Sequence, residues 1–208
     1  MIIALILLGL MAAVLAYPRL PEQVASHWNA QGQVDDYTPR FWGVALMPLI
    51  CIATTLLLWW LPSIDPLKAN IQTFRPTYNL FVVVMVLYFL YVYAATLAVN
   101  LGVPLNMSVA LVPAFAGLSY LMGVLVSNAR RNFFIGIRTP WTLSSDSVWD
   151  QTHRRGGRLF KWSVPVILLG LLFPSRAFAF LIAPLLGISL YLYIYSYWLY
   201  RGESESAR

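Results

Sequence analysis

The chain has 208 residues with a formal net charge of +6, and 60% of its residues are hydrophobic whereas 11% are charged. Soluble domains carry about 25% charged residues, so this composition excludes a water-soluble globule and indicates an integral membrane protein. The one cysteine, Cys51, excludes an intramolecular disulfide and a metal site built on cysteines.

Apolar segments of the length that crosses a membrane recur along the whole chain. A span needs roughly 20 mainly apolar residues, and six segments qualify: Ile2–Tyr17, Trp42–Leu61, Leu80–Val99, Val109–Val126, Leu159–Phe173 and Ala177–Tyr200. We therefore predict an all-α, polytopic membrane protein with about six transmembrane helices. The first segment could instead be a signal peptide cleaved near Ala16, but it lacks the basic start of such peptides, so a retained helix is expected.

The polar loop 18–41 follows the first segment and reads PRLPEQVASHWNAQGQVDDYTPRF. Leu20, Val24 and Trp28 are spaced four residues apart, which predicts an apolar stripe lying on the bilayer, with Gly32 as the turn. Four side chains could together bind a borderline divalent metal ion: His27, Asn29, Asp35 and Asp36. One histidine is a thin ligand set, however, and a folded extracellular lid without metal is the favoured interpretation.

The fourth apolar segment carries small residues at every fourth position, Ser119, Gly123 and Ser127, which predicts close packing against another helix. The apolar cores of the spans lack ionisable side chains. Lys161, near the start of the fifth segment, is assigned to the polar loop before that segment. Ion-coupled transporters and intramembrane proteases carry such groups at membrane depth. The pattern therefore argues against both classes, though not against a passive pore.

The segment 132–154 reads NFFIGIRTPWTLSSDSVWDQTHR and lies between the fourth and fifth spans. Pro140 disfavours helix at the residue before it, and Ser144 or Ser145 can cap a helix that starts there. We predict a short amphipathic helix that ends at Gly156-Gly157 and lies at the inner membrane interface.

Within this predicted helix, Trp149 and His153 share a face, and Trp149 is expected to insert into the interface. Asp150 and Arg154 are four residues apart and are expected to pair. His153 with a nearby serine could form a catalytic pair, but the segment lacks a glycine elbow and an orienting acid. We therefore predict no enzymatic activity. The arginines and aromatic residues of 128–138 fit anionic lipid better than nucleic acid.

The last two apolar segments are separated only by Pro174-Ser175-Arg176, which predicts a tight turn between antiparallel helices. Residues 191–200, YLYIYSYWLY, alternate with period two and could be read as a strand. A lone strand cannot satisfy its backbone in lipid, so a helix is expected.

Lysine and arginine residues are distributed unequally between the two sides of the predicted bundle. Eleven of the 14 lie in residues 62–79, in 127–161 or in the tail from Arg201, and the other three are Arg19, Arg40 and Arg176. Such a bias places the richer side in the cytoplasm. We expect a multi-pass protein of a bacterial cytoplasmic membrane, with both termini inside and loop 18–41 outside.

Two loops together resemble a known family. The inner segment resembles the signature of the SdpI/YfhL family of bacterial membrane proteins, matched by Asn132, Gly136, Ile137, Arg138, Thr139, Pro140, Trp141, Thr142, Leu143, Val148, Trp149, Thr152 and His153. The outer loop is similar to the N-terminal module that often accompanies this family, matched by Leu20, Pro21, Val24, His27, Trp28, Asn29, Gly32 and Asp35. A proline that is common before the histidine is replaced here by Ala25 or Ser26.

The resemblance implies an N-terminal module at residues 1–61 and a second module of four spans at 62–208. It implies a membrane immunity or sensor protein without cofactor, which resists a secreted peptide toxin and signals by holding a cytoplasmic repressor at the membrane. The residues expected to face the toxin are His27, Trp28, Asn29, Gly32 and Asp35. The residues of the cytoplasmic signature are Asn132, Gly136, Arg138, Thr139, Pro140, Trp141, Val148, Trp149, Thr152 and His153. A protein that handles lipids or small molecules, and a membrane enzyme using His27 or His153, remain the alternatives.

Overall fold

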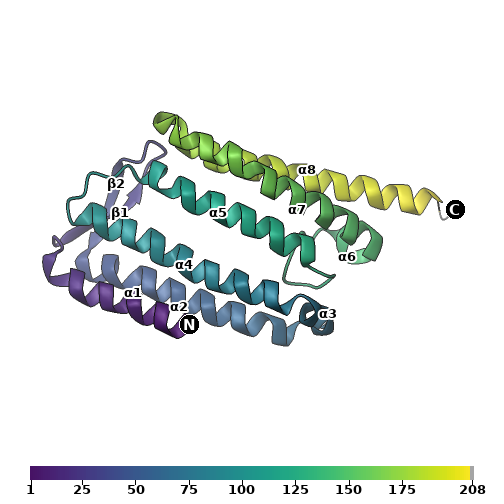
Figure 1. Ribbon diagram of the computed structural model, residues 1–208, viewed down its shortest axis with the longest axis horizontal. Helices are drawn as coiled ribbons and strands as arrows, with labels where there is room; N and C mark the ends of the chain where they lie inside the picture. The colour runs from purple at the N-terminus through teal and green to yellow at the C-terminus, as the bar shows by residue number, and fades with distance from the viewer. Residues whose placement is uncertain (207–208) are drawn as a thin grey trace.

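A computed structural model describes residues 1–206 of the chain as a bundle of long helices with a small β-hairpin at one end (Figure 1). The elements are α1 (Ile2–Ala16), η1 (Tyr17–Arg19), β1 (Gln23–Trp28), β2 (Val34–Pro39), α2 (Arg40–Ile64), α3 (Lys68–Thr73), α4 (Arg75–Asn100), α5 (Met107–Asn128), α6 (Pro140–Ser144), α7 (Asp146–Leu168), η2 (Leu169–Leu171), η3 (Pro174–Arg176) and α8 (Ala177–Ser206). We call the end with β1 and β2 the hairpin end. The opposite end, with α3, α6 and the loop 129–139, is the α6 end.

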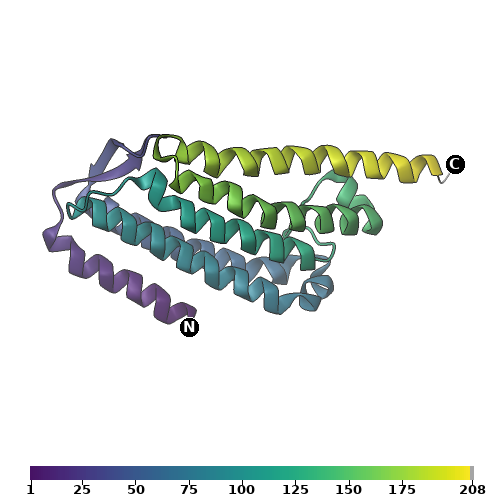
Figure 2. The ribbon, with the colours of Figure 1, turned by 45° about the horizontal axis from the view of Figure 1, so that its top comes forward.

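The long helices run side by side between these two ends, and α5 packs against α4, α7 and α8 (Figures 1 and 2). Among residues 1–206, five helical stretches are long and apolar enough to cross a membrane: Ile2–Arg19, Arg40–Ile64, Arg75–Asn100, Met107–Asn128 and Pro174–Glu205. Large apolar side chains such as Leu186 and Trp162 are exposed on the outside of the bundle, where lipid would cover them. The predicted all-α, polytopic membrane fold is confirmed.

Helix α7 differs from the sequence prediction. A short helix was expected to end at Gly156-Gly157, with a separate span from Leu159, but one continuous helix runs from Asp146 to Leu168. The two glycines lie inside this helix, where they are contact points for neighbouring helices. A Cβ on Gly157 would lie 1.9 Å from Ser127 Oγ of α5, and a Cβ on Gly156 would lie 3.0 Å from Leu192 Cδ1 of α8. Polar in its first half, α7 is not among the five stretches.

The outer loop also folds differently from the expected stripe on the bilayer. Residues 23–28 form a strand that pairs antiparallel with β2, from Gln23 opposite Pro39 to Trp28 opposite Val34. Leu20 and Val24 are 3% and 2% exposed and pack into the bundle against α1, α2 and α4. The stripe prediction was therefore wrong, because these side chains face the protein rather than the lipid.

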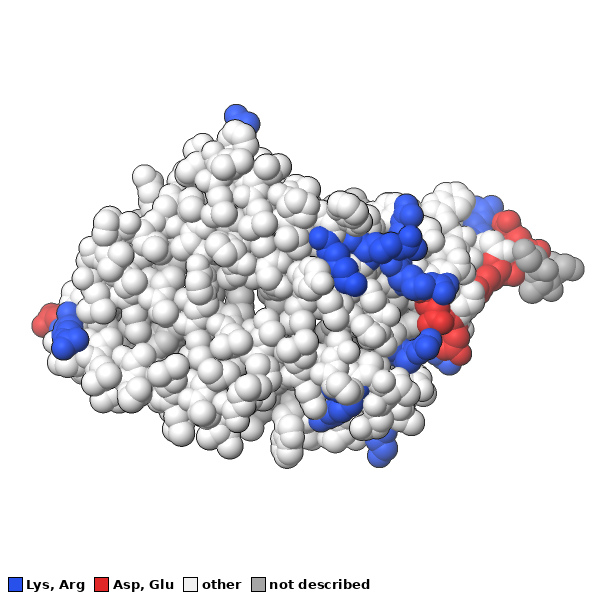
Figure 3. All heavy atoms as spheres, in the orientation of Figure 1, with Lys and Arg blue, Asp and Glu red and all other residues white. Residues whose placement is uncertain are grey.

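Charged side chains gather at the α6 end of the molecule, where Figure 3 shows most of the visible lysine and arginine. Beneath them lies a hydrophobic cluster that joins α3, α4, α5, α7 and the loop 129–139, made of Ile71, Phe74, Tyr78, Val82, Leu125, Ala129, Ile135 and Trp149. The α6 end is thus a folded layer with its own core.

Candidate functional site

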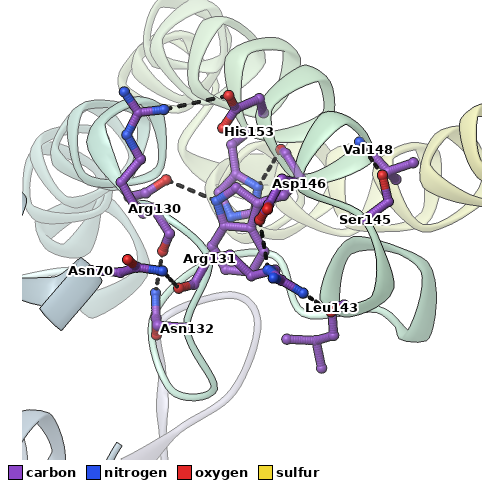
Figure 4. A network of polar contacts seen from close by, with 12 residues as sticks. Asn70, Arg130, Arg131, Asn132, Leu143, Ser145, Asp146, Val148 and His153 are labelled. Carbon is purple, nitrogen blue, oxygen red and sulfur yellow. Dashed lines mark hydrogen bonds and ion pairs between the residues drawn. The ribbon is translucent and has the colours of Figure 1, made fainter. Parts of the chain in front are cut away.

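The loop 129–139 is folded around the side chain of Asn132, which is completely buried. Its Oδ1 accepts hydrogen bonds from the backbone N–H groups of Phe134 at 2.9 Å and Ile135 at 2.6 Å. Its Nδ2 donates to the carbonyls of Arg130 and Ile135, both at 2.8 Å. Both N–H groups of this buried amide and both lone pairs of its oxygen are thus satisfied. Asn132 therefore fixes the shape of the loop (Figure 4).

Two residues outside the family signature attach this loop to the connection between α2 and α4. The carboxylate of Asp65, 2% exposed, accepts hydrogen bonds from the backbone N–H groups of Phe133 at 2.9 Å and Leu67 at 2.7 Å. Asn70 Nδ2 donates to the carbonyl of Arg131 at 2.7 Å. Neither residue was predicted from the sequence. The one available signal was a single acidic residue beside a proline in an otherwise basic connection.

Trp149 and His153 form the centre of the α6 end. Their rings stack with centroids 3.9 Å apart, and Trp149 Nε1 donates to the carbonyl of Ala129 at 2.8 Å. Trp149 is 1% exposed, so the expectation that it inserts into the membrane interface was wrong. Buried polar N–H groups need a partner, and the carbonyl of Ala129, the C-cap residue of α5, supplies it. Trp149 thereby fastens α7 to the end of α5.

The tautomer of His153 is fixed by two backbone groups. Its Nε2 accepts from the N–H of Ile137 at 3.0 Å, so its Nδ1 carries the proton and donates to the carbonyl of Trp149 at 2.8 Å. Burial lowers the pKa of His153 to about 4, although the hydrogen bond to Trp149 opposes this shift. His153 is therefore neutral at physiological pH and acts as a structural bridge between α7 and the loop.

Gly136 makes room for this bridge. Its backbone has φ of +121°, a conformation that side chains disfavour, and a Cβ there would lie 2.4 Å from His153 Nε2. Its place in the signature follows from the loop passing directly over the histidine ring.

The segment TPWT forms α6 and attaches the loop to α8. Thr139 is extended, as predicted, and caps α6 in a reciprocal pair with Thr142, while Pro140 occupies the first position of the helix. Thr139 Oγ1 lies 3.0 Å from Ser196 Oγ of α8. The ring of Trp141 packs edge-on against Tyr193 and Tyr197 of the same helix, with centroids 5.0 and 5.1 Å away.

The other signature residues occupy the same layer. Arg138 is exposed and donates to the carbonyl of Phe133 at 2.8 Å. Val148 and Thr152 are fully buried on α7. Ser145 caps α7 as predicted, accepting from the N–H of Val148 at 3.2 Å, and donates to Glu203 at 2.8 Å.

Two ion pairs connect α7 to the loop. Arg131 pairs with Asp146 at 2.6 Å and donates to the carbonyl of Leu143 at 2.9 Å (Figure 4). Asp150 pairs with Arg130 at 3.4 Å and not with Arg154, so the predicted pair within the helix was wrong. A partner on the loop is closer than the one on the next turn.

The structure does not assemble the serine–histidine pair that an enzyme would need. Ser144 donates to the carbonyl of Pro140 at 2.6 Å, and the Ser145 hydroxyl donates to the carboxylate of Glu203. Both ring nitrogens of His153 are already bonded to backbone groups.

At the hairpin end, His27 and Asn29 have distinct environments. His27 Nδ1 lies 2.6 Å from Asp35 Oδ1 across the two strands, and both side chains are exposed, at 68% and 41%. Asn29 Oδ1 accepts from the N–H groups of Gln31 and Gln33, both at 3.0 Å, and so shapes the turn. Gly32 has φ of +77° at this turn, as the prediction of a turn there requires.

Three polar residues hold the hairpin on the ends of α4 and α5. Asn100 pairs with both backbone groups of Ala25, accepting at 2.6 Å and donating at 3.1 Å, as a neighbouring strand would. Asn106 donates to the carbonyl of Gln31 at 2.8 Å, and Ser108 donates to that of Ala30 at 3.1 Å. None of these three residues was predicted from the sequence. Each borders a short break between apolar runs, which carried no distinctive signal.

Trp28 lies between the hairpin and α2. It lines a cavity of about 220 Å³ together with Trp42, Met47 and Met107, and its Nε1 has no hydrogen-bond partner among residues 1–206. Asp36 bonds the N–H of Tyr37 and does not join His27 and Asp35. Across the described part of the chain, no three His, Cys, Asp or Glu residues lie close enough together to hold a metal ion.

The predicted residues thus form two groups at opposite ends of the bundle: at the hairpin end His27 and Asp35 are exposed, whereas the residues at the α6 end are mainly buried. Comparison with known proteins matches both groups. The model of the SdpI/YfhL protein family matches residues 128–196, and that of a domain of unknown function, DUF1648, matches residues 4–52. The chain is similar to the Immunity protein SdpI of Bacillus subtilis (strain 168), with 22% identity over 152 residues, which cover 73% of this chain and 70% of the relative. No solved structure matches the chain. The match to the SdpI/YfhL family model thus covers the signature loop, α7 and most of α8.

Proposed function

We propose that this protein is an immunity protein of a bacterial cytoplasmic membrane and protects the cell against a secreted, membrane-active peptide. The name of the Bacillus subtilis relative supports immunity, and the five membrane-crossing stretches support the location. The α6 end faces the cytoplasm in this proposal, because it collects most of the lysine and arginine residues. The hairpin end then faces outward, where a secreted peptide arrives.

The observation that carries the proposal is the exposed His27–Asp35 pair on a firmly held hairpin. The hairpin is attached to α4 through Asn100 and to α5 through Asn106. A peptide that contacted the pair would therefore act, through the hairpin, on the helices α4 and α5 of the second module. Exposed polar groups on a rigid support are the usual way in which a protein presents a recognition surface.

The α6 end has a supporting role in the peptide resistance and carries no enzymatic activity. Its signature residues are mainly buried, and they hold α5, α7 and α8 together. A cytoplasmic repressor, if the protein recruits one, would dock on the exposed residues of α7 such as Arg155 and on Asp150 and Gln151, which are partly exposed. Changing Gln151 to alanine should then abolish recruitment without lowering the amount of folded protein.

Survival of a sensitive bacterium tests the immunity role. Cells expressing this protein are challenged with the peptide to which the Bacillus subtilis relative gives immunity, and with a panel of other secreted membrane-active peptides. We expect protection against at least one of them. The variant His27→Ala should lose most of that protection, whereas Gln33→Ala, an exposed position on the same hairpin, should keep it. Equal protection by both variants, at equal protein level, would remove His27 from the recognition surface.

Labelling of intact cells tests the orientation. Single cysteines at Gln31 and at Ser147, both exposed, are introduced after Cys51 is replaced by alanine. A membrane-impermeant thiol reagent should label the cysteine at position 31 and not the one at position 147. The reverse pattern would invert the arrangement and place the hairpin in the cytoplasm.

A further inference from the structure

A polar cavity of about 360 Å³ opens at the α6 end between the start of α4, the end of α5 and the first half of α7. Thr73, Asn128, Arg130, Asp150, His153 and Arg154 contribute to its walls. None of the residues proposed to recognise a peptide lies there. We propose that this cavity binds the phosphate of an anionic phospholipid headgroup in the cytoplasmic leaflet.

The arginines are the donors that the cavity offers to a ligand. The guanidinium of Arg154 makes no hydrogen bond or ion pair with any residue between 1 and 206, and it is exposed. Arg130 has one ionic partner, Asp150, at 3.4 Å, and 62% of its side chain is exposed. Planar guanidinium groups bind phosphate oxygens through paired N–H donors. Two such groups on one cavity form a site for an anion.

The other polar side chains in the cavity walls are already committed. Thr73 donates to the carbonyl of Asn70 at 2.7 Å, and Asn128 donates to that of Val124 at 2.8 Å. The two ring nitrogens of His153 are bonded to Ile137 and Trp149. The dipoles of α4 and α5 oppose one another here, because α4 begins and α5 ends beside the cavity. The charge of the arginines therefore decides what the cavity attracts.

The position of the cavity favours a lipid as the source of the phosphate. Helix α5 has 22 residues, which gives about 33 Å of length at 1.5 Å per residue, close to the roughly 30 Å of bilayer hydrocarbon. The end of α5 therefore lies at headgroup depth. Basic pockets between membrane helices on the cytoplasmic side are suited to anionic headgroups.

Native mass spectrometry of the detergent-solubilised protein tests the proposal. The protein is titrated with phosphatidylglycerol, with phosphatidylcholine, and with inorganic phosphate in excess. We expect preferential retention of phosphatidylglycerol. Arg154→Gln should weaken that retention by roughly three- to tenfold, and the double variant with Arg130→Gln should reduce it to the level of phosphatidylcholine.

Two further variants make the test selective. Arg155→Gln removes the same charge one position along α7, from a side chain bonded to Tyr191 at 3.1 Å and outside the cavity walls, so it should leave retention unchanged. Asp150→Asn removes the carboxylate that competes for Arg130, so it should increase retention. Equal losses in Arg154→Gln and Arg155→Gln, or a loss in Asp150→Asn, would overturn the site. Displacement of the lipid by inorganic phosphate or by an acidic peptide with the same dependence on Arg154 would refute the lipid as its ligand.

Discussion

Replacing Gly157 by alanine should destabilise the bundle, although alanine is the better helix former. In an isolated helix the change would stabilise by about 0.5–1 kcal/mol. Here the new Cβ would lie 1.9 Å from Ser127 Oγ and 2.8 Å from the carbonyl oxygen of Gly123. The serine hydroxyl can rotate away only by losing its 2.7 Å hydrogen bond to that carbonyl. The backbone oxygen cannot move unless α5 and α7 separate.

Overpacking of this kind costs about 1–3 kcal/mol, and more where backbone must shift. We therefore expect a net loss of about 1–2 kcal/mol for Gly157→Ala, which lowers the Tm by roughly 2–8 °C for a chain of this size. Thermal unfolding of the detergent-solubilised protein, followed by the loss of its monodisperse gel-filtration peak, measures the change. The matched control is Gly187→Ala on α8, where a Cβ meets no atom within 4 Å. A Gly157→Ala protein as stable as the control would contradict the close packing of α5 on α7.

Burial of His153 predicts a loss of stability in acid: its folded pKa of about 4 lies below the ordinary 6.5, so the unfolded state binds the proton first. Stability should fall by about 3 kcal/mol between pH 6.5 and 4 and then level off, and denaturant unfolding of His153→Gln should show a weaker pH dependence. Trp149→Ala, at a fully packed position, should cost about 3–5 kcal/mol, whereas Trp162→Ala on the same helix, 74% exposed, should change the Tm little. Asn100→Leu should release the hairpin, which limited proteolysis would detect as faster cleavage within residues 18–41.

The positions of the five stretches that are long and apolar enough to cross a membrane follow from the sequence alone. In lipid a chain must satisfy its own backbone hydrogen bonds, so an apolar run of sufficient length has little choice but to form a helix. This holds even for residues 191–200, whose period-two pattern resembles a strand and which lie within α8. Local signals were equally sufficient at Thr139 and Ser145, where a following proline and a serine hydroxyl act within three residues of the chain.

The hairpin shows where spacing is ambiguous. Leu20, Val24 and Trp28 are four residues apart, which places them on one face of a helix, but also on one face of a strand, because four is a multiple of two. The choice depends on β2 and on the amide of Asn100, which is 75 residues away from Ala25. No local pattern carries that information.

The α6 end depends still more on tertiary contacts. A pair of glycines predicts the end of a helix. Gly156 and Gly157 instead allow α5 and α8 to approach α7 closely. The position of Trp149 in the sequence predicts an interfacial anchor. In the fold its side chain is buried, because it donates to the carbonyl of Ala129 and packs in the core that contains Tyr78. A small or an aromatic side chain has the same local preference in both settings. Which setting applies is decided by the elements that the rest of the chain places beside it.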